Sequence, residues 1–593
     1  MLLPRPTTII AALAIALPAC TETFVATGGS SAGGTSSSTS VASGGAGSGG
    51  GAGSSGSVGG GGGATCDDTD ADGDGYSLCE HDCDDDNPFV HPDALEICGD
   101  GADEDCDGKD NTGDDCADYT VYVSATGNPG AKGTIEDPCS LVSEAVLIAN
   151  GWSRPAAILV SAGAYTDDVL VTGSISVVGG YDPNDWSTRD PKAFETTLKS
   201  KVAEGVRLVD LGPEMLVDGL KIVGRSVNMG IDSSVALAID GGGPVVSNCV
   251  IRGGDVSVGP GKSVAVSIVA QAASATKPRL WLDDIQSGAA AAGPSYGLVL
   301  DAPTADLQLI GSVVTAGKGT DSVAFLIEDS KSVIAWRDSL QSGSAVGSAQ
   351  PSVSLGLWAK RGALYFDSGI VNADQITAPP LCFTPSVWCG GARISTGTAI
   401  FSNNIVLGSA SERSAAIHLL EIDDDLADVV VTSNLVYAAG ELSAESVSAA
   451  VLLGSPRSDP VVTMVGRFRD NVFVGGTATY NYSFFEQHTP GESCDPAALD
   501  HDLFYFPVIV PNEGRLYADW DGNNAADLAT LADLPGDGSN LEGDPKYDNG
   551  HLQSDSPCRN AGTDLDAPNH DIDQDVRPQE DAYDIGPDEF IPN

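Results

Sequence analysis

From residue 119 to residue 593 the chain repeats short apolar runs, each bounded by small or polar residues. Apolar and polar side chains alternate within these runs, which is the pattern of a half-buried β-strand. An apolar residue in a similar local context recurs at steps of 26 to 37 residues. The pattern therefore predicts many short strands in a loose repeat. The aligned positions are Val250, Ile285, Ile370, Ile405, Leu435 and Val472, with weaker copies at Val314 and Leu340.

Repeats of this length indicate a solenoid, in which no coil can bury its apolar face without its neighbours. Stacked coils give parallel strands, a continuous aliphatic interior and backbone hydrogen bonds between coils. We therefore expect an all-β fold, a right-handed parallel β-helix, over residues 119–593. An array of β-sandwiches or a propeller is the alternative, although a propeller would be spaced more regularly. Helical spacing of apolar residues predicts one helix, near Ser140 to Asn150.

The two ends of this block carry recognisable segments. The beginning reads Tyr119-Thr-Val-Tyr122 and, further on, Val177-Val-Gly-Gly180-Tyr181-Asp182. The end includes Ser556-Pro-Cys-Arg-Asn-Ala-Gly562 and Asp584-Ile-Gly-Pro-Asp-Glu-Phe590. These segments resemble the first coil and the C-terminal segment of pectin-lyase-like bacterial surface proteins, of the type called choice-of-anchor Q. The resemblance implies a helix that caps the first coil. It departs at Pro587-Asp588, where the family has Ala-Tyr.

The N-terminal pattern is different, with an apolar run from Thr8 to Ala19. This run is too short to span a bilayer and is typical of a signal peptide, which we assign to residues 1–19. It ends Leu17-Pro-Ala-Cys20, which resembles a bacterial lipobox. The resemblance implies a lipid on Cys20 and a location at the outer membrane or cell surface of a Gram-negative bacterium. An ordinary secretory signal is the alternative. Residues 20–65, rich in Gly and Ser, are then a flexible linker.

Residues 66–118 form an acidic module, with 21 Asp or Glu residues and one basic residue, Lys109. A segment with so much charge and so few apolar residues stays disordered unless cations neutralise it. Carboxylates spaced as in Asp70-Ala-Asp-Gly-Asp-Gly75 can wrap one ion, because glycine allows the sharp turn. Oxygen ligands in such loops favour Ca²⁺. An acidic disordered spacer and a site for another metal remain the alternatives.

The acidic module also carries the parts of a known motif. These are the Asp-x-Asp-Gly-Asp-Gly opening at 70–75, Asp82-Cys-Asp-Asp85, Pro92-x-Ala-x-Glu96 and the close at 100–108. They resemble the metal-binding motif named after the MopE surface protein, and thrombospondin type 3 calcium loops. Asp93 and Glu104 depart from that motif, which usually has Gly and Asn there. The candidate metal ligands are Asp70, Asp72, Asp74, Tyr76, Asp82, Asp84, Asp86, Glu96, Asp100, Asp103, Asp105, Asp107 and Asp110.

The chain has 13 cysteines, and twelve remain when Cys20 is set aside. Export to an oxidising compartment predicts that those of the acidic module form disulfides, with the pairing left open. Zinc is the alternative, although the spacing lacks paired C-x₂-C units. Cys382 and Cys389 could close a short loop, and Cys249 is expected to be a buried free thiol. The cysteines of the module are Cys66, Cys79, Cys83, Cys98, Cys106 and Cys116.

The chain carries 83 acidic and 29 basic residues, for a net charge of −54. This charge argues against nucleic-acid binding and repels anionic uronate polymers. A lyase of the pectate-lyase type would need carboxylates on successive coils beside a base, although Asp is also a common turn residue. The positions that could supply such a site are Lys221, Arg252, Asp283, Asp284, Arg337, Asp338 and Asp367.

Together these features predict a lipid-anchored, calcium-binding β-helix on the cell surface with a structural, adhesion or glycan-binding role. Its expected partners are the membrane, through the lipid anchor, and an extracellular glycan or surface protein. One alternative is an exported polysaccharide lyase or hydrolase on the same fold. The other is a metal-sequestering surface protein. We assign no catalytic residue from the sequence.

Overall fold

The computed structural model divides the chain into two compact units, one comprising Cys20–Cys116 and the other including Ala117–Asn593. The described residues are 76–84, 90–92, 94, 96–97, 103–109 and 119–592, the last range without 214, 230–231, 271–276, 346–352, 374–388, 396–397, 410, 421–427, 441–445, 455–465, 488–494, 508–514, 521–524, 529, 535, 537 and 549–550. No helix in this described part is long and apolar enough to cross a membrane.

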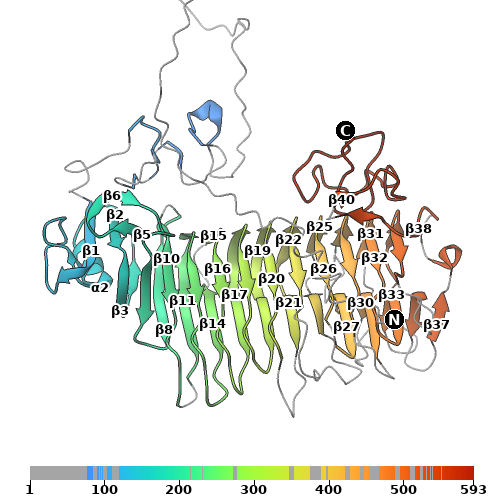
Figure 1. Cartoon of the computed structure of the whole chain (residues 1–593), viewed down its shortest axis with the longest axis horizontal. Helices are drawn as coiled ribbons and strands as arrows, with labels where there is room; N and C mark the ends of the chain where they lie inside the picture. The colour runs from blue at the N-terminus through green and yellow to red at the C-terminus, as the bar shows by residue number, and fades with distance from the viewer. Residues whose placement is uncertain are drawn as a thin grey trace, which may run out of the picture. The chain divides into compact units, whose positions relative to one another are not determined.

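The larger unit is built from two long sheets whose strands are mainly parallel (Figure 1). The first sheet has 13 strands: β3 (Gly163–Asp167), β7 (Thr196–Ser200), β10 (Leu220–Val223), β13 (Val250–Arg252), β16 (Asp284–Gln286), β18 (Val313–Thr315), β20 (Ser339–Gln341), β23 (Ile370–Asn372), β26 (Ile405–Leu407), β29 (Leu435–Tyr437), β32 (Val472–Val474), β35 (Leu503–Tyr505) and β38 (Leu541–Glu542).

The second sheet has 25 strands: β1 (Thr120–Asn128), β2 (Ala156–Ser161), β4 (Leu170–Thr172), β5 (Ile175–Asp182), β6 (Asp185–Arg189), β8 (Glu204–Leu211), β9 (Leu216–Asp218), β11 (Ser234–Gly242), β12 (Val245–Ser247), β14 (Ser263–Val269), β15 (Arg279–Trp281), β17 (Ser295–Ile310), β19 (Ser322–Trp336), β21 (Ser354–Ala359), β22 (Ala363–Asp367), β24 (Cys389–Ile394), β25 (Thr398–Ser402), β27 (Arg413–Leu419), β28 (Asp428–Thr432), β30 (Val447–Gly454), β31 (Gly466–Arg469), β33 (Tyr480–Gln487), β34 (Ala498–Asp500), β36 (Arg515–Trp520) and β37 (Ala525–Leu528).

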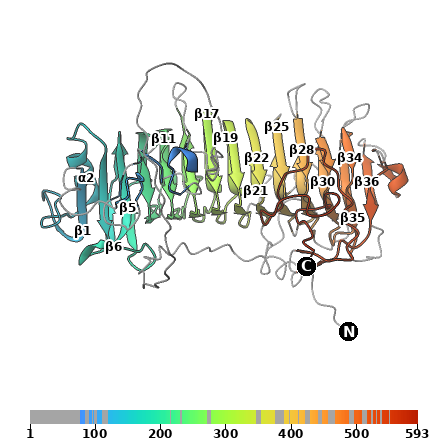
Figure 2. The same cartoon turned by 90° about the horizontal axis from the view of Figure 1, so that it is seen from above.

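Strands of successive coils pair in parallel and in chain order, so the predicted parallel β-helix is confirmed. Each coil gives one strand to the 13-stranded sheet and, in most coils, two segments to the other sheet. The strands lie side by side along one axis in both views (Figure 2). Each coil can therefore satisfy the backbone groups of the next one, which is why the fold extends beyond the size of one ordinary core.

A single column of apolar residues fills the interior side of the 13-stranded sheet. Each member pairs in register with the next, and none is more than 2% exposed. Burial of such side chains is the main favourable contribution to folding. The column consists of Tyr165, Leu198, Ile222, Ile251, Ile285, Val314, Leu340, Val371, Val406, Val436, Phe473 and Phe504.

Some of the repeat positions predicted from the sequence lie in this interior column, and others lie in the adjacent column, whose side chains point outward. Ile285, Val314 and Leu340 lie in the interior column, but Val250 pairs with Asp284, on the opposite face of the strand from Ile285. The prediction is therefore wrong by one residue at five positions, and a shift of one residue in a strand turns a side chain to the other face. The misplaced positions are Val250, Ile370, Ile405, Leu435 and Val472.

A ladder of polar side chains lines the turn before the 13-stranded sheet. The backbone N–H of Asn404 donates to Asn434 Oδ1 (2.8 Å), and Asn434 N–H donates to Asn471 Oδ1 (3.1 Å). Asn471 N–H donates to Asp502 Oδ1 (2.8 Å), and Asp502 N–H donates to Asn540 Oδ1 (2.9 Å). The turn residues of the repeat therefore satisfy buried backbone donors from one coil to the next.

Both ends of the β-helix are covered. Helix α2 (Val142–Ala149) lies beside β1 and β2 and buries Val142, Ala145, Val146 and Ala149, so the predicted helix near Ser140–Asn150 is confirmed. At the other end, β36 and β37 pair antiparallel, and a short 3-10 helix, η3 (Leu531–Asp533), follows.

The last part of the chain, residues 543–592, which we call the C-terminal segment, folds back along the outer side of the 13-stranded sheet (Figure 2). Its only strands in the described part are the short antiparallel pair β39 (Tyr547–Asp548) and β40 (His551–Leu552). Its apolar side chains pack on the outward residues of β26, β29, β32 and β35. The cluster includes Ile405, Leu435, Val472 and Leu503 from the sheet and Leu552, Cys558 and Ile585 from the C-terminal segment.

Candidate metal-binding site

The acidic module is held together by few apolar residues and a disulfide. A short 3-10 helix, η1 (Leu78–Glu80), precedes Cys83, and Cys83 is bonded to Cys106 with their Cα atoms 5.8 Å apart. Val90 and Ile97 are buried, and the Tyr76 ring stacks on His91 with centroids 4.9 Å apart. A module with so small a core depends on cross-links for its stability.

The loop from Asp103 to Gly108 wraps around its own carboxylates. Asp103 accepts hydrogen bonds from the backbone N–H groups of Asp107 (3.1 Å) and Gly108 (2.8 Å). Asp105 also accepts one from Asp107 N–H (3.1 Å). Gly108 has φ +91°, the left-handed conformation that glycine adopts without strain. These bonds fix the direction in which the two carboxylates point.

Glu96 meets Asp103 and Asp105 of this loop. One oxygen from each carboxylate lies within 4.8 Å of the others, and Glu96 is only 5% exposed. Three carboxylates at this separation repel one another strongly unless a proton or a cation lies between them. The cluster consists of oxygen donors alone, which is the ligand set that suits a hard divalent cation. The residues therefore fit a metal site.

Two neighbouring acidic residues have different surroundings. Asp82 is 4% exposed and accepts a hydrogen bond from Asp84 N–H (2.8 Å), while its Oδ2 is buried without a hydrogen-bond partner among the described residues. Glu104 is buried and accepts a hydrogen bond from Ile97 N–H (2.9 Å). The glutamate that departs from the usual motif thus binds the backbone of Ile97 across the module.

The structure brings together three of the thirteen candidate ligands. Tyr76 stacks on His91, Asp84 is half-buried, and Asp107 forms an exposed ion pair with Lys109 (3.6 Å). The remaining candidates lie outside the described residues and stay predictions. They are Asp70, Asp72, Asp74, Asp86, Asp100 and Asp110.

The disulfide predictions are confirmed in part. Cys83 and Cys106 pair with each other, and Cys79 and Cys389 are also disulfide-bonded. Cys249 is a buried free thiol, as predicted, and Cys139 and Cys558 are buried free thiols as well. Other candidates, Cys66, Cys98, Cys116 and Cys382, lie outside the described residues, as does Cys20.

Two of the carboxylates considered for a lyase site are buried in the wall of the β-helix. Asp283 and Asp338 are fully buried in the turn ladder, where they accept hydrogen bonds from Cys249 N–H and Ser312 N–H (both 2.8 Å). Burial raises the pKa of both carboxyl groups well above the usual range. Side chains inside the wall cannot reach a polysaccharide, so these two residues have a structural role.

The basic candidates are engaged on the outer surface. Lys221 forms an ion pair with Glu195 (2.9 Å), and Arg252 binds both carboxylate oxygens of Asp284. Each of these two basic side chains is thus held by a carboxylate of a neighbouring coil.

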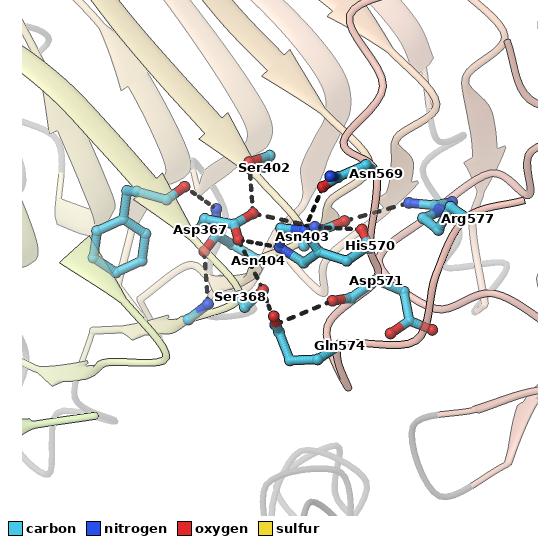
Figure 3. Close-up of polar contacts among 12 residues, drawn as sticks. Asp367, Ser368, Ser402, Asn403, Asn404, Asn569, His570, Asp571, Gln574 and Arg577 are labelled. Atoms are coloured by element: carbon cyan, nitrogen blue, oxygen red, sulfur yellow. Dashed lines mark hydrogen bonds and ion pairs between the residues drawn. The ribbon is translucent and has the colours of Figure 1, made fainter. Parts of the chain in front are cut away.

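Asp367 binds the C-terminal segment (Figure 3). Its Oδ2 lies 2.7 Å from His570 Nε2, and its Oδ1 accepts hydrogen bonds from Ser402 Oγ (2.7 Å) and Asn403 Nδ2 (3.1 Å). Asn403 Nδ2 also donates to the His570 carbonyl (2.9 Å), and Arg577 donates to Asn403 Oδ1 (3.3 Å). These contacts hold a distant part of the sequence, the loop around His570, against the β-helix.

An apolar row lies open on the outer face of β19, β22 and β25. Ile334, Tyr365 and Ile400 pair in register on successive coils and are 44%, 39% and 37% exposed. Trp336 lies two residues beyond Ile334 on the same face, and the Arg337 guanidinium sits 4.8 Å from its ring centre. Arg337, the last basic candidate, therefore flanks an aromatic surface. No pattern along the sequence indicates this surface, because the row exists only across coils.

A second outward column carries polar groups that the sequence did not reveal. Trp358, Arg393 and His418 pair in register on β21, β24 and β27. Arg393 and His418 are 7% and 5% exposed, and His418 Nε2 donates to the Gly454 carbonyl (3.1 Å). Burial lowers the pKa of His418 to about 3 and that of Arg393 to about 10. Because both side chains are buried, they are not part of the solvent-exposed outer surface.

The fold and the site define a parallel β-helix protein with an acidic metal-binding motif. Residues 82–111 match the MopE family model, which is described as a "Putative metal-binding motif". No curated protein matches the chain in sequence.

Several solved structures are similar to the β-helix. Pectate lyase Pel9A is 13% identical, with 80% of this chain and 96% of that chain covered and a TM-score of 0.37. The A-module of mannuronan C-5 epimerase AlgE4 from Azotobacter vinelandii is 11% identical, with 64% and 93% covered and a TM-score of 0.35. The Dettilon tailspike protein is 8% identical, with 67% and 68% covered and a TM-score of 0.35. These similarities concern the fold alone.

Proposed function

We propose that this chain is a calcium-binding β-helix of the cell surface, anchored by a lipid on Cys20, which binds glycan along its outer face. The observation that supports the metal site is the convergence of Glu96, Asp103 and Asp105 within a segment that matches a metal-binding family. A bound divalent cation would neutralise these carboxylates and hold the acidic module folded.

Calcium is favoured by the donor set. Copper and zinc prefer imidazole and sulfur ligands, but the cluster is made of carboxylates. His91 is the nearest described histidine in sequence, and it stacks on Tyr76, with its Nδ1 2.9 Å from the Pro92 carbonyl. Cys83 and Cys106 are consumed in their disulfide. The ligands that remain are hard oxygens, and these suit Ca²⁺.

Glycan binding is supported by the open row of Ile334, Tyr365 and Ile400 beside Trp336. Aromatic and aliphatic side chains contact the C–H faces of sugar rings, while Arg337 can donate hydrogen bonds to hydroxyl groups. Coils repeat every ~4.8 Å, which is close to the length of one sugar unit in an extended chain. Because the protein carries a net charge of −54, a neutral polysaccharide is favoured over a polyanion.

Calcium titration of the full chain tests the metal site. We expect chelator-treated protein to bind Ca²⁺ with heat released in calorimetry, and Asp103→Asn combined with Asp105→Asn to weaken binding at least tenfold. Asp301→Asn, which changes an exposed aspartate of the β-helix, is the matched control and should bind as the parent does. Equal binding by the double variant and the control would refute the assignment.

Binding to neutral polysaccharides tests the outer face. We expect the protein to be retained on an insoluble neutral glycan such as cellulose or chitin, and Trp336→Ala or Tyr365→Ala to reduce retention. Tyr480→Ala is the control, because this tyrosine is 50% exposed on β33, away from the row. Retention that is equal in all variants would contradict the role of this row.

The lipid anchor is tested separately. We expect the chain to incorporate a radiolabelled fatty acid in a bacterial host and to fractionate with membranes, and Cys20→Ser to lose both properties. A Cys20→Ser protein that still fractionates with membranes through a lipid would contradict the assignment.

A further inference from the structure

The C-terminal segment contains a cluster of possible ligands that is separate from the acidic module. His551 lies on β40, and Asp573 and Asp588 lie on two loops of the same segment. His551 Nδ1 is 3.1 Å from Asp588 Oδ1 and 3.4 Å from Asp573 Oδ2. One donor atom from each of the three residues lies within 4.8 Å of the others.

Hydrogen bonds fix β40 and the two loops relative to one another. Leu552 N–H donates to Asp588 Oδ2 (2.6 Å), which leaves Asp588 Oδ1 directed at His551. Ile572 N–H donates to the Pro587 carbonyl (2.8 Å), so the loops that carry Asp573 and Asp588 lie against each other. These bonds hold the Asp588 carboxylate in place and keep the two loops together.

The surroundings of His551 carry an excess of negative charge. Asp573 and Asp588 both lie within 3.4 Å of the same imidazole nitrogen. Asp571, which is fully buried, accepts a hydrogen bond from Asp573 N–H (2.9 Å), so a third carboxylate lies in the same loop. A divalent cation would balance this charge.

We propose that His551 Nδ1, an oxygen of Asp573 and an oxygen of Asp588 bind a divalent transition metal of the zinc class. Ligands ~2.0–2.1 Å from a tetrahedral zinc ion lie about 3.4 Å from one another. The two measured His551–carboxylate distances, 3.1 and 3.4 Å, match that spacing. An imidazole nitrogen with two carboxylates suits zinc better than calcium, so this site differs in kind from the acidic module.

The bound ion would cross-link the C-terminal segment. It would join three parts of a segment that has almost no regular secondary structure in its described residues, and would leave a fourth position open to water or a ligand. Asp588 stands where the resembled C-terminal segments have Tyr, so the site would be a feature of this chain. Because His551 and Asp573 are 56% and 36% exposed, an ion can enter from solvent.

The experiment measures Zn²⁺ and Co²⁺ binding to the full chain in the presence of excess Ca²⁺, which occupies the acidic module. We expect one equivalent of Co²⁺ with the visible absorption of a four- or five-coordinate site, and competition by Zn²⁺. His551→Gln and Asp573→Asn should each weaken binding at least tenfold. His501→Gln is the matched control, because His501 lies on the β-helix with its Nδ1 3.1 Å from Ser539 Oγ, and it should not change binding.

Two outcomes would overturn the proposal. One is the absence of stoichiometric Co²⁺ or Zn²⁺ binding, which would leave a protonated His551 paired with its carboxylates. The other is binding that His551→Gln and Asp573→Asn leave unchanged. Asp573 is partly exposed, so its substitution should leave the fold intact. A variant that carries Asp103→Asn and Asp105→Asn should keep the Co²⁺ signal, which separates this site from the proposed calcium site.

Discussion

Replacing Asp502 with Asn should stabilise the protein at neutral pH. Asp502 is fully buried in the turn ladder, where its Oδ1 accepts hydrogen bonds from Asn471 N–H (2.8 Å) and Asn471 Nδ2 (3.0 Å). Its Oδ2 has no hydrogen-bond partner in the described structure. On the next coil, Asn540 fills the same position and donates its Nδ2 to the Leu499 carbonyl (2.7 Å). An amide at position 502 can donate in the same way.

The gain should depend on pH in a defined direction. Burial raises the pKa of Asp502 well above its usual range, whereas the unfolded chain ionises near pH ~4. The stability that this group contributes is therefore fully present below pH ~4 and is lost as pH rises towards the folded pKa, by about 1.4 kcal/mol per pH unit. Asn does not titrate. Asp502→Asn should therefore be more stable than the parent at pH 7 by what the parent has lost, about 1.4 kcal/mol for each pH unit between ~4 and the folded pKa.

Denaturant unfolding followed by circular dichroism at pH 4, 7 and 8.5 tests this reasoning. We expect the difference in unfolding free energy between Asp502→Asn and the parent to be small at pH 4 and to grow with pH. Asp301→Asn, at an exposed position, is the control and should show no such trend. The reasoning fails if Asp502→Asn is less stable at pH 7, or if the difference is the same at all three pH values.

Three further tests concern other parts of the structure, the first two by denaturant unfolding. Ile251→Ala removes an interior side chain and should cost about 2–5 kcal/mol, whereas Val250→Ala on the outward column should cost less than about 1 kcal/mol; equal costs would contradict the register. Arg577→Met leaves buried Glu589 unpaired and should cost about 3–5 kcal/mol, and a neutral effect would contradict a buried ion pair. Cys106→Ser should lower calcium affinity measurably in calorimetry, because it opens the disulfide beside the carboxylates.

The repetition of coils and their spacing could be predicted from the sequence, because polar turn residues recur once per coil. The register of the strands could not be predicted in the same way. In the C-terminal half, the outward residues Ile405, Leu435 and Val472 are apolar because the C-terminal segment covers them. Both faces of those strands are therefore buried, and the apolar–polar alternation that identifies the interior face disappears.

The two candidate metal sites also differ in how far the sequence indicates them. The carboxylates of the acidic module lie close together in sequence, and their spacing with glycine is enough to indicate a metal loop. His551, Asp573 and Asp588 are far apart in sequence, and no spacing rule connects them. They meet only because the segment between them folds back on itself, which depends on its contacts with the β-helix.

The C-terminal segment covers an apolar strip of the β-helix that would otherwise be exposed to water. Ile405, Leu435, Val472 and Leu503 come from four different coils, so the C-terminal segment can dock only after those coils have stacked. If the segment were undocked, these side chains would be exposed, and an exposed apolar strip of this kind is a ready contact for aggregation. The stacking of the coils and the protection of this strip are thereby linked.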